Sequence, residues 1–213
     1  AVQLISGYEE SGQLTQYPIS YVDEVKKHFS KFDDHRVVGM YKEMWQAGFS
    51  HDAPFDLVLH HGPPPEMELL ASQSEEMLKK SGGAGKASEF MDALRDFAAD
   101  SNFAAFFRNH AEFYDVLPRR ISAKDAGGLI SEVESYCGYS QKSYSLFLSP
   151  LLKHGAYGVM LEGENGISDS IGIIGPHGAV DGMPRFDRKE YFKNYVRNVA
   201  IFPFVVPLVD KYW

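Results

Sequence analysis

The sequence predicts an α+β fold, in which a helical N-terminal part precedes a small, mostly antiparallel sheet and a C-terminal helix. Over residues 1–140, apolar residues recur at a spacing near 3.6, which is typical of helices. Over residues 141–213 the spacing falls to near two, as in strands, before a last apolar segment. The 213 residues can bury a sizeable core, and we expect both regions to form one continuous domain.

Ser20 is predicted to be the N-cap of the first helix. Asp23 follows three residues later, a variant of the capping box. Val22, Val25 and Phe29 then fall on one face at helical spacing. This face is expected to contact the core.

A second helix is predicted, and two segments that are not predicted to be helical follow it. That helix is expected over residues 35–47 and ends at Gly48, a frequent helix stop. Residues 51–66, "HDAPFDLVLHHGPPPE", are a short apolar segment ended by three prolines. Residues 79–88, "KKSGGAGKAS", are predicted to form a flexible loop.

Three further helices are predicted before the sheet. The third carries Phe90 and Phe97 inward, and Asn102 caps the fourth. The fifth opens at Ser122, with Asp125 three residues on, and ends near Gly138. The inward residues of the fourth helix are aromatic or imidazole side chains: Phe103, Phe106, Phe107, His110 and Tyr114.

Three strands are predicted from "SYSLFLSPLL", "AYGVMLE" and "SIGIIG". Asn165 and Gly166 lie between the last two, and Asn-Gly is a strong hairpin signal. A loop rich in Gly and Pro follows, and the terminal helix is expected to begin near Arg188.

Composition excludes several classes of function. The formal net charge of −8 argues against a nucleic-acid or anionic-membrane surface. Cys137 is the only cysteine, which excludes an intramolecular disulfide and a thiolate zinc cluster. No apolar run approaches the roughly 20 residues of a membrane span, and no basic and apolar leader opens the chain.

Local motifs assign no reaction. The segment "GGAGKAS" lacks the glycine and the hydroxyl residue of a phosphate-binding loop, because Lys80 and Ala87 stand at those positions. His60 and His61 would face opposite ways on a strand, so we expect structural or exposed histidines rather than a metal pair. His110 is expected to be a hydrogen-bonded core or groove histidine, and Cys137 a small buried thiol.

One strand is a candidate for peptide binding. Tyr157, Gly158, Val159 and Met160 lead into the predicted hairpin, and a strand at a sheet edge offers free backbone donors and acceptors. Extended peptides bind such edges by strand addition. From the residues alone, an ordinary edge strand is the favoured interpretation.

Several stretches, in order along the chain, resemble a bacterial family of uncharacterised, secreted proteins similar to gluzincin-type zinc metallopeptidases. They are "SYVDEVKKHFSKFDDHRVV", "FSHDAPFDLVLH", "FMDALRDFAADSNFAAFFRNHAEFY", "YCGYSQKSYSLFLSPLLKHGAYGV" and "IIGPHG…DGMPRFD". The resemblance implies peptide-bond hydrolysis with zinc as cofactor, peptide or protein partners, and a secreted or cell-envelope location. It also implies that residues 157–160 hold the substrate backbone.

The zinc-binding motif itself is absent from this chain. In the family the last helix carries His-Glu-x-x-His before residues like "PLVDKY", and two His four apart bind zinc on one helix face. Without gaps, the motif falls on residues 198–202, "NVAIF", which leaves no catalytic residue and no metal ligand to assign.

Two interpretations follow. The chain is a catalytically inactive relative that binds peptide through the same groove, or the natural molecule carries the motif in a segment after Ile201. A similar shortening within "AVQLISGYEE" and the end of the chain before the third ligand favour the second interpretation.

Overall fold

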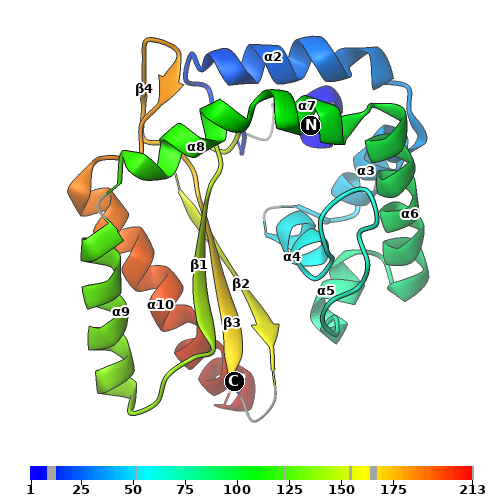
Figure 1. Cartoon of the computed structure of the whole chain (residues 1–213). Helices are drawn as coiled ribbons and strands as arrows, with labels where there is room; N and C mark the ends of the chain where they lie inside the picture. Colours follow the sequence, from blue (N-terminus) through cyan, green and yellow to red (C-terminus); the bar gives the residue numbers. More distant parts are fainter. Residues whose placement is uncertain (9–12, 51, 122, 154, 164–166, 213) are drawn as a thin grey trace.

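A three-stranded sheet stands between two groups of helices in the computed structural model of this chain (Figure 1). The structure describes residues 1–8, 13–50, 52–121, 123–153, 155–163 and 167–212, with side chains outside 123–127 and 206–212. The predicted α+β class is confirmed, because nine α-helices of the described chain precede the sheet and a long helix follows it.

The helices that precede the sheet run from the N-terminus to residue 137. They are α1 (Val2–Ile5), α2 (Ser20–Phe29), the 3₁₀ turn η2 (Ser30–Phe32), α3 (Arg36–Gln46), α4 (Ala53–Leu59), α5 (Glu75–Lys80), α6 (Ala84–Asp100), α7 (Phe103–Asn109), α8 (Ala111–Arg119) and α9 (Ala123–Cys137).

The start of α2 differs from its prediction, whereas α3 agrees. Ile19, in an extended conformation, occupies the N-cap of α2, and Ser20 is the first residue of the helix. No side chain forms a capping hydrogen bond at this helix start. At α3 the ring of His35 accepts a hydrogen bond from the backbone N–H of Val37. Gly48 follows this helix with a φ of 106°, the left-handed region that favours glycine.

Two segments predicted without helix are helical. Residues 53–59 form α4, which has Pro54 in its first turn. The predicted flexible loop at 79–88 is wrong, since Lys80 ends α5 and Ala84 begins α6. Only a tight turn separates these helices, with Gly82 and Gly83 at φ values of 86° and 102°. Because the glycines permit this turn, the charged residues on both sides can stay helical.

The predicted fourth helix is divided into α7 and α8 at His110, and Asn102 takes the expected N-cap position. Asn102 adopts a left-handed conformation, with φ 50°, and its side chain makes no capping hydrogen bond. The predicted cap at Ser122 lies outside the described residues.

The main sheet is mixed. Its strands are β1 (Ser143–Leu148), β2 (Ala156–Glu162) and β3 (Ser168–Ile174), in the order β1-β3-β2. β2 pairs with β3 in the antiparallel sense predicted for a hairpin, but β1 pairs with β3 in parallel. The predicted Asn165-Gly166 turn lies outside the described residues. A short ribbon of β4 (Ala179–Val180) and β5 (Met183–Pro184) follows.

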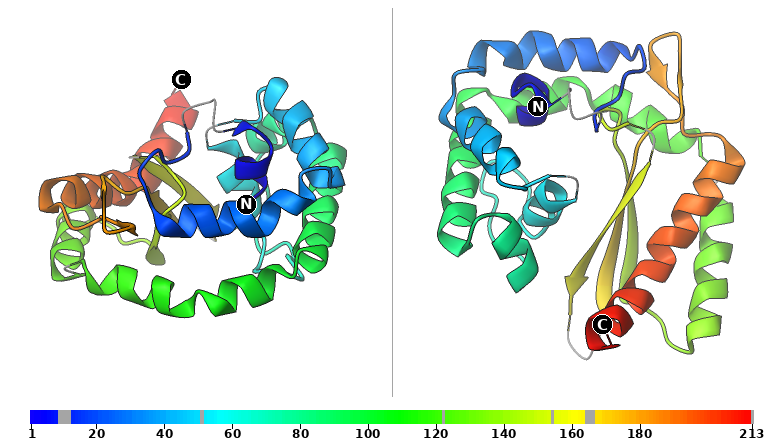
Figure 2. Two further views of the ribbon diagram at one scale, coloured as in Figure 1. Left: turned by 90° about the horizontal axis from the view of Figure 1, so that it is seen from above. Right: turned by 180° about the vertical axis from the view of Figure 1, so that it is seen from behind.

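The terminal helix α10 (Lys189–Tyr212) lies against one face of the sheet, with α9 beside it (Figure 2). The other face contributes Ile173 to a large apolar cluster built mainly from α1 to α7. A second cluster joins α8, α9 and α10 to the sheet through Ile174. None of the helices in the described residues has the length and apolar character needed to cross a membrane.

A candidate peptide-binding groove beside the edge strand

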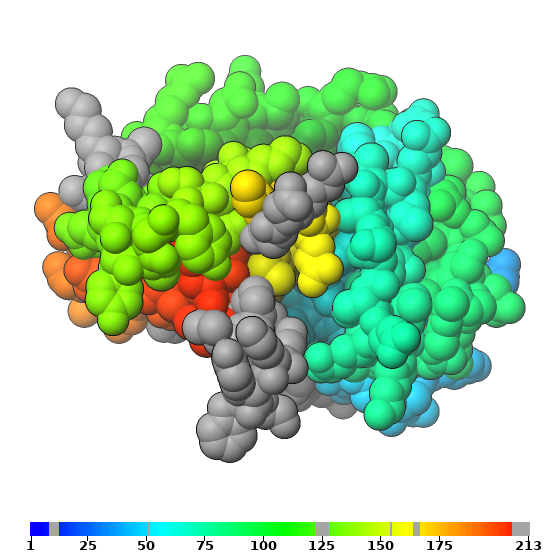
Figure 3. Space-filling model, turned by 90° about the horizontal axis from the view of Figure 1, so that it is seen from below, coloured from blue at the N-terminus to red at the C-terminus, as the bar shows by residue number. Residues whose placement is uncertain are grey.

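A groove of about 570 Å³ runs along the outer edge of β2. Its far wall comes from α4, α5 and the segment between them, and Phe202 of α10 contributes at one end. Viewed from below, the yellow surface of β2 lies between the cyan surface near α5 and the red surface of α10 (Figure 3). Segments far apart in the sequence therefore form this groove.

Three of the four residues predicted to bind peptide line the groove. They are Gly158, Val159 and Met160. Tyr157 does not line it: its ring packs against Phe55 of α4, with centroids 5.1 Å apart, and its hydroxyl donates a hydrogen bond to Gln13 Oε1 over 2.6 Å. Tyr157 thus anchors β2 to the helical part of the molecule.

A pair of glycines lets α10 reach the groove. Gly158 on β2 lies directly opposite Gly172 on β3. A Cβ atom at Gly158 would stand 3.2 Å from the ring of Phe202, and one at Gly172 would stand 2.4 Å from Val199 Cγ2. The absence of side chains at this pair therefore allows a close approach of helix and sheet, and it brings Phe202 beside the edge strand.

Carboxylates outnumber cations along the groove. Its walls carry Asp52, Asp56, Glu76 and Glu162. Lys80 is the only Lys or Arg among the lining residues, and its Nζ lies 3.0 Å from Glu76 Oε1 and 3.6 Å from Asp52 Oδ2. These ion pairs, led by the hydrogen bond to Glu76, raise the pKa of Lys80. The groove is thus electronegative.

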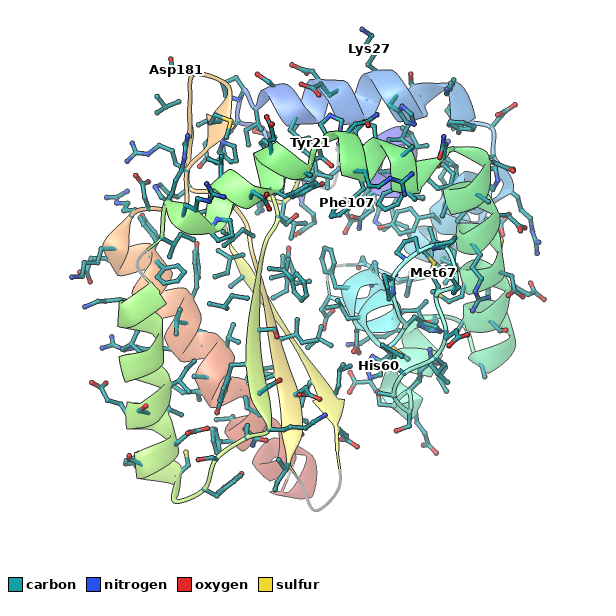
Figure 4. The ribbon with its side chains drawn as sticks, viewed as in Figure 1. Tyr21, Lys27, His60, Met67, Phe107 and Asp181 are labelled. Carbon is teal, nitrogen blue, oxygen red and sulfur yellow. The ribbon has the colours of Figure 1, made fainter. Side chains whose placement is uncertain are left out.

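His60 lies at the end of α4 (Figure 4), and His60 and His61 both bond to that helix end rather than forming a metal pair. The strand assumed for them is wrong, because His60 is the C-cap of a helix. Its Nδ1 donates to the Asp56 carbonyl oxygen over 2.7 Å, and that of His61 donates to the Leu57 carbonyl over 2.8 Å. The ring of His61 supplies a donor to a carbonyl that the helix end leaves free, whereas the ring of His60 adds a second donor to the Asp56 carbonyl, which also accepts the backbone N–H of His60. Both contacts agree with the expected structural role.

Asp56 has an environment that favours its neutral form. Burial raises the pKa of the Asp56 carboxyl, and the neighbouring Asp52 adds to this effect, whereas His60 opposes it. Its Oδ1 lies 3.3 Å from His60 Nδ1. The i, i+4 spacing of Asp56 and His60 would have indicated their proximity had residues 53–59 been predicted as a helix.

The residues at the expected position of the zinc motif do not fit a zinc ion. Val199 packs on Gly172, Ala200 is buried, and Phe202 enters the groove, so no side chain there offers a nitrogen, sulfur or carboxylate ligand. Among the described residues, no group of three or more His, Cys, Asp and Glu side chains could hold a metal ion. No zinc-dependent step follows from these residues.

Two other candidates lie away from the groove. His110 Nε2 is 2.6 Å from Glu24 Oε2 and its Nδ1 donates to the Phe106 carbonyl over 2.7 Å, so the ring connects α2 to α7 as a structural histidine. Cys137 is a free, partly buried thiol at the end of α9.

Comparison with known proteins identifies the family. The family described as a domain of unknown function, DUF4932, matches residues 2–213. The chain belongs to the DUF4932 family. No curated protein and no solved structure matches it. The geometry of this DUF4932 domain is therefore the basis for a functional proposal.

Proposed function

We propose that this domain binds an extended peptide or protein segment by strand addition to the outer edge of β2. The observation that carries the proposal is the groove along that edge. β2 ends the sheet on this side, and within the described residues no other segment forms a backbone hydrogen bond with residues 157–162 from outside the sheet. A bound strand would obtain its affinity from those backbone groups and its specificity from the groove walls.

The walls favour a segment with cationic side chains. Four carboxylates and one ion-paired lysine line the groove, and the chain as a whole carries a formal charge of −8. Complementary charge speeds association and disfavours acidic competitors. Alternating Lys or Arg side chains on the bound strand would face these carboxylates.

The position of Phe202 favours a second candidate, zinc-dependent peptide hydrolysis. If the natural molecule carries the motif after Ile201, the missing His-Glu would directly precede Phe202, which lines the same groove as β2. This candidate requires a natural molecule that carries the missing His-Glu-x-x-His, and it would accompany a secreted or cell-envelope location. An intact mass above 23.9 kDa together with bound zinc would support it, and a mass of 23.9 kDa would contradict it.

The peptide proposal is tested with a fluorescein-labelled peptide of alternating Lys and Val, about eight residues long. Fluorescence anisotropy measures its affinity for the purified domain. Two analogues are N-methylated, one at every Val amide and the other at every Lys amide. Since alternate N–H groups of a strand face the same neighbour, only one analogue should lose binding. Equal binding of both analogues and the parent peptide would contradict strand addition.

Proline variants give the matched test on the protein. Adjacent residues of an antiparallel strand point their N–H groups to opposite sides, so Met160→Pro and Leu161→Pro have different consequences. One variant should lower the thermal unfolding midpoint by removing a bond to β3. The other should keep the midpoint and lose peptide binding. If both variants bind the peptide as the wild type does, the edge of β2 is not the site.

A further inference from the structure

A second hollow, of about 670 Å³, lies among α1, α3, α4, α6 and α7. None of its lining residues also lines the groove beside β2. Large apolar side chains form most of its walls, among them Phe55, Met67, Phe90, Leu94, Phe103 and Phe107. Its volume and lining are those of a small-molecule site rather than of a packing defect.

The loop that forms one wall is fixed from outside the hollow. Arg95 Nε donates to the Glu66 carbonyl over 2.8 Å, and its Nη2 donates to the Met67 carbonyl over 2.9 Å. Met67 adopts a left-handed conformation with φ 45°, which is unfavourable for its side chain, and only 5% of the residue is exposed. These bonds hold Met67 in the wall opposite Phe107 of α7 (Figure 4), so contacts within the protein fix this wall of the hollow.

Few polar groups line this hollow. The amide of Gln3 donates a hydrogen bond to the hydroxyl of Tyr41 over 3.0 Å, so these two side chains partner each other. Arg108 is the only charged side chain among the lining residues, and it is exposed, with no hydrogen bond or ion pair to another described residue. Phe107, beside it in sequence, is 47% exposed. One unpaired cation therefore stands at the rim of an apolar hollow.

We propose that this hollow binds a free long-chain carboxylate, with the hydrocarbon chain inside and the carboxylate on the guanidinium of Arg108. The walls provide contact for methylene groups and few hydrogen-bonding groups, so a strongly polar ligand would lose hydration without compensation. The planar guanidinium matches a carboxylate with two parallel hydrogen bonds. This site is independent of the proposed peptide groove.

Isothermal titration calorimetry tests the proposal with decanoate, dodecanoate and tetradecanoate, each below its micelle-forming concentration. We expect one bound molecule per chain and an affinity that rises about fourfold for each added methylene. The primary alcohols of the same chain lengths lack the carboxylate, so the difference in affinity measures the contribution of the head group. Arg108→Gln should lower carboxylate affinity about tenfold and leave the alcohols unchanged. Arg119→Gln, an exposed arginine of α8 outside the hollow, is the matched control.

A cavity-filling variant tests where the chain lies. Ala104 lines the hollow from α7, so Ala104→Phe should abolish binding of carboxylates and alcohols alike while the circular dichroism spectrum stays that of the wild type. Several molecules bound per chain, no dependence on chain length, or unchanged binding by Ala104→Phe would overturn the proposal. Equal effects of Arg108→Gln and Arg119→Gln would overturn the assignment of the head group. If the wild-type domain sediments with dioleoylphosphatidylglycerol vesicles and Ala104→Phe does not, the hollow binds membrane lipid, and the choice of a free ligand is overturned.

Discussion

The hydroxyl of Ser170 on β3 donates a hydrogen bond to the backbone carbonyl of Val199 on α10, over 3.0 Å. In a regular helix this carbonyl would accept from the residue four positions later. That residue is Pro203, which has no N–H. Ser170 therefore supplies the donor that the proline removes, and the sheet stabilises an α10 that contains proline in its interior.

Ser170→Ala is expected to destabilise the domain by about 1–3 kcal/mol, because it leaves the buried Val199 carbonyl without a donor. Chemical denaturation followed by circular dichroism measures the change. In a Pro203→Ala background the alanine N–H restores the helical bond, so the same serine change should cost less. Ser145→Ala on the exposed side of β1 is the control and should change stability by less than about 0.5 kcal/mol. If Ser170→Ala destabilised the domain equally with and without Pro203→Ala, the idea that Ser170 replaces the donor missing at Pro203 would be contradicted.

The glycine pair predicts a second, steric dependence. Gly172→Ala would place its Cβ 2.4 Å from Val199 Cγ2 and 2.9 Å from Leu146 Cδ2. We expect a loss of about 1–3 kcal/mol by overpacking, measured by denaturation. Gly39→Ala in α3 is the contrasting change, since no atom lies within 4 Å of its added Cβ, and it should stabilise the domain by about 0.5–1 kcal/mol. If Gly172→Ala changed the free energy of unfolding as Gly39→Ala does, the close packing of α10 on Gly172 would be contradicted.

Local periodicity predicted the elements of this fold better than their pairing. The strands predicted from residues 156–162 and 170–175 are confirmed as β2 and β3, although β3 begins two residues earlier, at Ser168. The parallel pairing of β1 with β3 depends on packing between distant segments, which no local pattern records. Residues 53–59 escaped prediction as a helix because α4 is short and apolar, and short apolar runs suit strand and helix equally.

The groove was only partly visible in the sequence. Edge position made residues 157–160 a candidate, although an ordinary edge strand was favoured from the residues alone, and the resemblance to gluzincin-type proteins implied the peptide-binding role. Three of these residues line the groove. The opposite wall comes from α4 and α5, about a hundred residues earlier, and its carboxylates become neighbours only through the fold. Phe202 could not be assigned to the groove, since its contact depends on the absence of a side chain at Gly158.

Glu162→Gln tests the charge of the groove. Glu162 is exposed on β2 and lines the groove, so the change removes one carboxylate without disturbing the core. We expect the affinity for the alternating Lys-Val peptide to fall about two- to fivefold, with a weaker dependence on salt concentration. Fluorescence anisotropy across a salt series provides the measurement. Glu89→Gln on the exposed side of α6 is the control, and an equal effect there would indicate attraction by net charge alone.

Acidification is expected to destabilise the end of α4 through His61. Burial, the largest cause, lowers the pKa of the His61 imidazole, although the hydrogen bond to the Leu57 carbonyl opposes this shift. With a folded-state pKa below the unfolded value of about 6.5, the unfolded chain binds the proton first, so stability is full above that value and falls as the pH drops through it. His61→Asn keeps a donor for Leu57 but does not titrate. Between about pH 8 and pH 5.5, its thermal midpoint should therefore decrease less than that of the wild type. Equal decreases in the two proteins would contradict a role for His61.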